Sequence, residues 1–260
     1  MRLSILISLI ALLCACNSDH QSIDINSNAN VHVRVAERGL DQTSAVLRKQ
    51  QVSNPSYQID IMLNAEGTPF SGSNLISFDF QPRGYDLSVD FTGGEVIEVL
   101  INGQSADYQY NGFFLNFDER QFETGTNQLK IVYTHPYSKD GAGLYYFKDP
   151  LDQTVYTYSD LEPYDANRIF PLFDQPNLKA RFTLNVDVPA AWQVVSANRE
   201  SSITKQADRA LWQFPETLPI SSYIISVHAG EYASFDLGDY EGIALRLFSR
   251  QSSPQYVPVD

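Results

Sequence analysis

The residues best suited to chemistry lie in one stretch from Asp160 to Asp174 that mixes carboxylates with apolar side chains. On the residues alone, Glu162 fits two roles equally well. It could bind an amine, or it could be a loop carboxylate that accepts hydrogen bonds from nearby backbone N–H groups. Arg168 and Asp174 flank apolar residues, where an unpaired charge would be costly. We therefore expect Arg168 and Asp174 to form a structural ion pair or backbone hydrogen bonds beneath this loop.

Metal-binding and nucleophilic motifs are missing from the sequence. The four histidines are scattered, at His20, His32, His135 and His228. None is followed by glutamate, so no His-Glu-x-x-His zinc motif exists. A Gly-x-Ser-x-Gly elbow, a phosphate-binding loop and a dinucleotide fingerprint are also missing. We therefore expect no catalytic residue and no metal in this chain, and predict that it is inactive alone.

The N-terminus predicts a lipid anchor. After a basic start, residues 3–13 are almost wholly apolar, too short to span a bilayer and typical of a signal peptide. The end of this run, Leu13-Cys14-Ala15-Cys16, resembles the lipobox of bacterial lipoproteins, which implies cleavage before Cys16 and acylation of its sulfur. An ordinary signal peptide with two incidental cysteines is the alternative. The anchor places the chain at the cell envelope, with the periplasmic side of the outer membrane favoured over the inner membrane.

The charge of the chain limits its partners. Lys and Arg total 18 against 31 Asp and Glu, giving a formal net charge of −13. Such a surface repels phosphate backbones, so we expect no nucleic-acid partner. The same balance modestly favours cationic or free-amine ligands, although its commoner effect is solubility.

An all-β fold must position these residues. From Tyr57 onward, apolar and polar residues alternate with the period of a half-buried strand. Turn residues separate many such short runs, which predicts an antiparallel β-sandwich or a large curved sheet. One short helix is expected within residues 31–50, after a polar tether at 17–30. The expected strands are 57–63, 76–80, 96–101, 113–117, 128–133, 155–158, 182–188, 192–196, 210–214, 223–229 and 243–248.

A run of motifs within residues 57–250 carries a family resemblance. They are Gly141-Ala-Gly-Leu144, Tyr156-Thr-Tyr158, Glu162-Pro-Tyr-Asp-Ala166, Arg168, Phe173-Asp-Gln-Pro176 and Leu178-Lys-Ala180. Together they resemble the N-terminal portion of the aminopeptidase N family of zinc metallopeptidases, the gluzincins. The resemblance implies a saddle-shaped, all-β domain.

The resemblance also implies a role for the Glu162 loop. In the family this loop reaches the catalytic cleft, and the Glu at the position of Glu162 binds the free α-amino group of a peptide substrate. A carboxylate distinguishes a charged N-terminus from an internal amide, because only the former gives a charge-assisted hydrogen bond. Where the family commonly has Gln, this chain has Asp160, which adds a second negative charge to the substrate-binding region. The resemblance places zinc, its ligands and the general base in a C-terminal catalytic domain outside this chain.

These features predict the organisation and function of the chain. Residues 1–15 form the lipoprotein signal peptide, 16–56 the tether and short helix, 57–250 the β-domain, and 251–260 a linker toward an absent catalytic domain. The expected function is that of the N-terminal domain of a membrane-anchored zinc aminopeptidase that helps to recognise peptide N-termini. The alternative is a stand-alone, non-catalytic β lipoprotein that binds peptides or proteins. A carbohydrate-binding sandwich has only the aromatic content in its favour.

Overall fold

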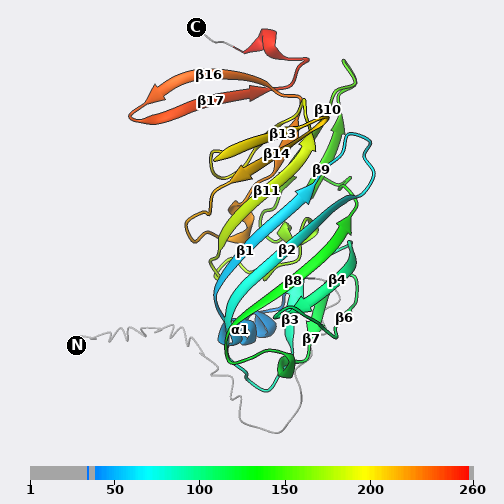
Figure 1. Ribbon diagram of the computed structural model, residues 1–260, viewed down its shortest axis with the longest axis vertical. Helices are drawn as coiled ribbons and strands as arrows, with labels where there is room; N and C mark the ends of the chain where they lie inside the picture. Colours follow the sequence, from blue (N-terminus) through cyan, green and yellow to red (C-terminus); the bar gives the residue numbers. More distant parts are fainter. Residues whose placement is uncertain (1–33, 35–38, 258–260) are drawn as a thin grey trace, which may run out of the picture. The chain divides into compact units, whose positions relative to one another are not determined.

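The computed structural model describes residue 34 and residues 39–257, which lie in one compact unit, Val31–Asp260 (Figure 1). Cys16 and the tether expected at 17–30 lie outside the described residues. Among the described residues strands dominate and a single α-helix accompanies them, so the all-β prediction is confirmed. Within the described part of the chain, no helix has the length and apolar character needed to cross a membrane.

The largest sheet has eight strands and forms the backbone of the unit. Its order is β13 (Ser202–Gln206), β14 (Arg209–Phe214), β11 (Arg181–Pro189), β1 (Val52–Met62), β2 (Phe70–Phe80), β8 (Gly125–His135), β4 (Glu95–Ile101) and β5 (Gln104–Ser105). Every pair is antiparallel except β1 with β11, which run parallel with Ile59 opposite Leu184. The sequence-based expectation of an antiparallel sheet therefore fails at this one central pair.

Three smaller sheets complete the structure. One contains β12 (Gln193–Val195), β15 (His228–Gly230), β10 (Val155–Asp160) and β9 (Gly143–Lys148). A second contains β3 (Leu87–Asp90), β7 (Phe114–Phe117) and β6 (Gln109–Tyr110), and β16 (Ala233–Tyr240) pairs with β17 (Ile243–Ser249) as a hairpin. Short 3-10 turns lie at Glu119–Gln121, Ala166–Arg168, Ser222–Ile224 and Pro254–Tyr256.

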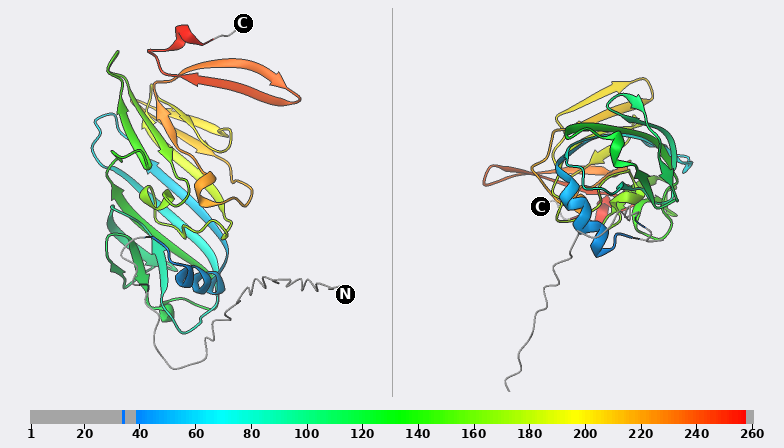
Figure 2. Two further views of the ribbon diagram at one scale, coloured as in Figure 1. Left: turned by 180° about the vertical axis from the view of Figure 1, so that it is seen from behind. Right: turned by 90° about the horizontal axis from the view of Figure 1, so that it is seen from below.

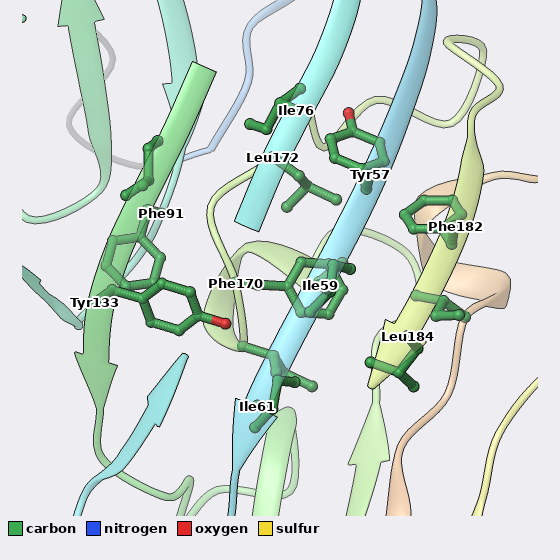
Figure 3. Packing of buried hydrophobic residues seen from close by; sticks show 14 of the residues in the cluster. Tyr57, Ile59, Ile61, Ile76, Phe91, Tyr133, Phe170, Leu172, Phe182 and Leu184 are labelled. Carbon is green, nitrogen blue, oxygen red and sulfur yellow. The ribbon is translucent and has the colours of Figure 1, made fainter. Parts of the chain in front are cut away.

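The core forms where the apolar faces of the strands meet the segment between β10 and β11. In β11 every second side chain is buried, in the period predicted for residues 182–188. Phe170 and Leu172, which follow the Glu162 loop, are fully buried in the same cluster as Ile59 and Leu184 (Figure 3). Full burial of each such side chain contributes about 1.5–3 kcal/mol. Because this segment lies on one face of the large sheet (Figure 2), its packing fixes the end of the loop.

The helix belongs to the β-domain and not to the tether. α1 (Gln42–Gln51) begins after Asp41, whose side chain caps it by accepting a 2.8 Å hydrogen bond from Ser44 N. Arg48 in its last turn is only 2% exposed. β1 follows immediately at Val52, ahead of the boundary expected at residue 57.

One predicted strand is largely wrong. Residues 223–229 were expected to be extended, but Ser222–Ile224 form a 3-10 turn and only His228–Gly230 pair as a strand. Side-chain hydrogen bonds, and not backbone pairing with a neighbouring strand, hold the start of this segment. The Ser221 hydroxyl donates to Pro176 O at 2.9 Å, and the Ser222 hydroxyl donates to Asp174 at 2.5 Å.

Candidate functional site

The loop after β10 presents Asp160 and Glu162 to solvent. β10 ends at Asp160, Leu161 is buried, and Glu162 is exposed before a cis Glu162–Pro163 peptide bond. Neither carboxylate hydrogen bonds or ion-pairs with another described residue. Of the two roles left open by the sequence, a loop carboxylate bonded to backbone N–H groups is therefore not what the structure contains.

Tyr164 ties this loop to a buried carboxylate. Its hydroxyl donates a 2.7 Å hydrogen bond to Asp90 Oδ1 and accepts a 3.0 Å bond from Arg34. Asp90 is fully buried at the end of β3, where it pairs with Arg34 and with Arg48, the latter at 2.6 Å. Burial acts to raise the pKa of Asp90, but Arg48, Arg34 and their hydrogen bonds outweigh it and lower the pKa. The loop thus rests on a buried ionic cluster of Asp90, Arg34 and Arg48.

Arg168 and Asp174 have separate partners, so the ion pair predicted between them does not form. Arg168 pairs with Asp140 at 2.8 Å and with Asp165 at 3.6 Å. Asp174 Oδ2 accepts hydrogen bonds from Asn167 N at 3.0 Å and Asn167 Nδ2 at 2.9 Å. The predicted backbone hydrogen bond is therefore present at Asp174. Together these contacts hold Asn167 and Arg168 of the 3-10 turn Ala166–Arg168.

Several carboxylates lie around the loop, and Arg168 pairs with two of them, Asp140 and Asp165. Burial raises the pKa of Asp165, and the nearby charges of Asp140 and Asp160 act in the same direction, while Arg168 opposes them. Arg168 lowers the pKa of Asp140 to about 2, so Asp140 already holds its counter-charge. Asp160 and Glu162 remain available to a ligand. A carboxylate of this kind can accept charge-assisted hydrogen bonds from an ammonium group.

The described residues do not fit a zinc ion. No group of three or more His, Cys, Asp or Glu side chains among residues 34 and 39–257 is placed to hold a metal. The ring nitrogens of His135 lie 2.7 Å from the carbonyl oxygens of Thr92 and Pro136, and burial lowers the pKa of His135. His228 lies on β15, where burial also lowers its pKa. His20 and His32 lie outside the described residues.

Sequence reasoning missed the ionic cluster beneath the loop. Asp90 stands inside the run Leu87-Ser-Val-Asp-Phe91, and a charge in so apolar a run was the available signal. Its arginine partners lie far away in the chain, at Arg34 and Arg48, and periodicity gives no pairing between distant segments. A strand at Leu87–Asp90 was not predicted either.

The fold is shared with part of a larger protein of known structure. The structure of native leukotriene A4 hydrolase from Saccharomyces cerevisiae is similar, with a TM-score of 0.60 and 22% sequence identity. The match covers 73% of this chain and 31% of that one. The same yeast protein in complex with bestatin gives a TM-score of 0.60 at 21% identity. At this level of identity the likeness establishes the architecture alone.

Sequence comparison supplies the family. The Peptidase M1 N-terminal domain model matches residues 53–224, and the chain belongs to this family. Aminopeptidase N of Streptomyces lividans is 30% identical over 230 residues, which are 85% of this chain and 26% of that protein. A putative aminopeptidase-2 of Caenorhabditis elegans is 33% identical over 193 residues, 70% of this chain and 10% of that protein. The chain therefore spans only a small part of these relatives.

Proposed function

We propose that this chain is the substrate-recognising β-domain of a zinc aminopeptidase, and that Glu162 accepts hydrogen bonds from the α-ammonium group of a peptide. One observation carries the proposal. The Glu162 carboxylate is exposed and unpaired among the described residues, on a loop whose neighbours are fixed by buried ion pairs. A preorganised loop loses little conformational entropy when it binds, so its carboxylate suits selective recognition of a terminal amine.

Asp160 strengthens the selectivity for cations in this proposal. It ends β10 two residues before Glu162 and is also exposed. A second negative charge beside the first attracts an ammonium group and repels an acidic peptide end. Zinc and the general base would be supplied by polypeptide outside this chain, which we propose alone is inactive.

The hairpin of β16 and β17 supports the presence of further polypeptide in the working protein. It lies beyond the family match at residues 53–224 and exposes a row of apolar side chains. A two-stranded hairpin with an uncovered apolar face is marginally stable in water, so it gains by packing against more protein. The exposed side chains are Leu237, Tyr240, Ile243, Leu245 and Leu247.

We further propose that acylation of Cys16 holds the protein at the envelope membrane, facing the periplasm. The support is the sequence of the lipobox-like segment that ends at Cys16. One acyl group binds a membrane only weakly, whereas several acyl chains on one cysteine give stable anchoring.

An aminopeptidase assay tests the proposed function. The purified chain from residue 17 to 260 and the product of the complete reading frame would each be given an aminoacyl chromogenic amide, with and without added zinc. Turnover by the longer product alone supports the proposal. A reading frame that stops after Asp260, with an inactive product, would favour the binding lipoprotein. Zinc-dependent turnover by residues 17–260 would contradict the assignment of the metal site to other polypeptide.

A further inference from the structure

The turn between β9 and β10 binds the segment that follows β17 through hydrogen bonds and an ion pair. Asp149, the residue after β9, accepts a 2.7 Å hydrogen bond from the Ser252 hydroxyl and forms a 3.0 Å ion pair with Arg250, both through Oδ2. Its Oδ1 accepts a 3.0 Å bond from Leu151 N. The side chain of Asp149 is 1% exposed. A buried carboxylate that joins segments so distant in sequence is a specific contact, unlike an exposed surface pair.

Aromatic residues of the same two strands complete the contact. The Tyr156 hydroxyl of β10 accepts a 2.8 Å hydrogen bond from Gln251 N. The Arg250 guanidinium lies 5.3 Å from the centre of the Phe147 ring of β9, and that ring stacks with Tyr156. Three consecutive residues, Arg250, Gln251 and Ser252, are therefore each held by β9, β10 or the turn between them. The linker predicted at 251–260 is thus a docked segment at its start.

The two strands connect this contact to the Glu162 loop. β10 begins at Val155, directly after Thr154, whose carbonyl accepts a 2.8 Å hydrogen bond from Asp149 N. It ends at Asp160, two residues before Glu162. Along its length β10 pairs with β9 on one side, and its middle residues, Tyr156 to Tyr158, pair with β15 on the other. A strand supported in this way changes length and direction little, so its two ends keep a fixed separation.

We propose that Asp149 is a positioning residue: it fixes the polypeptide that leaves the domain at residues 250–252 relative to Glu162, through the rigid pair β9 and β10. The role rests on the proposed function, because Glu162 can meet a substrate amine in register only if the following polypeptide is correctly placed. Misplacement of reacting or binding groups by small distances is expensive in catalysis. Asp149 itself touches no substrate in this account.

Hydrogen exchange of the 260-residue chain tests the contact without reference to any activity. Asp149→Asn keeps the acceptor for Leu151 N but removes the charge opposite Arg250. Exchange of the amides of residues 250–253, that of Gln251 above all, should become about tenfold faster. Ser252→Ala, a milder change, should give a smaller acceleration. Asp187→Asn is the control, since Asp187 also pairs with an arginine, Arg209 at 2.8 Å, on the large sheet. Unchanged exchange at Gln251 in both Asp149→Asn and Ser252→Ala would overturn the proposal.

Kinetics of the complete gene product test the positioning role. Asp149→Asn should raise KM for a free-amine substrate at least about threefold with a smaller change in kcat, as expected for misplaced substrate binding. In a Glu162→Gln background the same change should have no further effect on KM, because the role acts through Glu162. If Asp149→Asn raises KM equally in the parent and in the Glu162→Gln background, Asp149 has only a structural role. If Glu162→Gln itself leaves KM unchanged, the proposed function fails and positioning fails with it, whereas the exchange result still decides whether the contact exists.

Discussion

The Tyr164 hydroxyl donates a 2.7 Å hydrogen bond to Asp90 Oδ1, which joins the loop of Glu162 to a carboxylate with no solvent exposure. The other oxygen of Asp90 accepts from Arg48 at 2.6 Å and from Asp174 N at 2.8 Å. Every charge in this cluster thus has a partner, as burial requires. The exposed part of the loop is thus held through Tyr164 by three buried side chains, Asp90, Arg34 and Arg48.

Removal of Asp90 should destabilise the domain severely. Asp90→Ala leaves Arg34 and Arg48 buried without their counter-charge, a change that typically costs about 3–5 kcal/mol. Tyr164→Phe should cost only about 1 kcal/mol, because one neutral donor is lost. Urea unfolding followed by the fluorescence of the two buried tryptophans, Trp192 and Trp212, measures both. Asp118→Ala is the control, since its pair with Arg120 is exposed and should matter little. A similar loss in Asp90→Ala and Asp118→Ala would contradict the importance of the cluster.

Stability should depend on pH through Asp174. Burial, aided by the charge of Asp90, raises the pKa of Asp174 from 3.8 to about 6, against the hydrogen bonds from Ser222 and Asn167. A raised pKa means that the neutral form stabilises the fold. This contribution is complete below pH 3.8 and is lost as the pH rises through about 6. Its size is of the order of 3 kcal/mol, because the pKa moves from 3.8 to about 6.

The variant Asp174→Asn isolates that contribution. Asn can accept the bonds from Asn167 through its oxygen and donate to the Ser222 hydroxyl, so it imitates the neutral acid. As the pH rises from 4 to 7, the unfolding free energy of the parent should fall relative to that of Asp174→Asn. Urea unfolding at a series of pH values checks this. A difference that stays constant over the range would show that Asp174 is ionised throughout.

Loss of the Glu162 charge should weaken substrate binding in the active enzyme. Glu162→Gln removes a hydrogen bond to a charged group, worth about 1.5–3 kcal/mol, so KM for free-amine substrates should rise roughly 10- to 100-fold. Because kcat reports the bound complex, it should fall less. Steady-state kinetics with an aminoacyl amide measure both constants. Glu123→Gln, another exposed glutamate of the domain, should leave them unchanged. Unaltered kinetics in Glu162→Gln would remove the residue from substrate recognition.

Membrane attachment should depend on one of the two cysteines. Cys16→Ser should move the protein from the detergent phase to the aqueous phase in a detergent-partition experiment, because the acyl chains are lost. Cys14→Ser is the matched control and should stay in the detergent phase. Aqueous partition of both variants, or of neither, would argue against lipid attachment at Cys16.

Periodicity predicted the strands well where one face of a strand packs on the core. Residues 182–188 alternate cleanly and form the centre of β11. It did not predict which strands become neighbours, because alternation fixes the face of a side chain and not its partner strand. The parallel pair of β1 and β11 is therefore absent from the prediction. For the same reason the sequence indicated Glu162 and Asp160 but not the support from Asp90.

Segments held by side-chain hydrogen bonds were harder to predict than strands. Residues 223–229 were predicted as a strand, yet the neighbouring Ser221 and Ser222 bond to Pro176 and Asp174 far away in the sequence. Residues 251–260 carry no apolar period and were predicted as a linker, although Tyr156 holds Gln251 and Asp149 holds Ser252. In both places a long-range polar contact overrides the local pattern.

The parallel pairing of β1 with β11 also governs the order in which the chain can assemble during its synthesis. β1 ends at Met62, and its central partner begins only at Arg181. Until the ribosome has released β11, one edge of β1 stays open, with apolar side chains such as Ile59 uncovered. Antiparallel contact with β2 can form early, but closure of the core must wait for most of the domain.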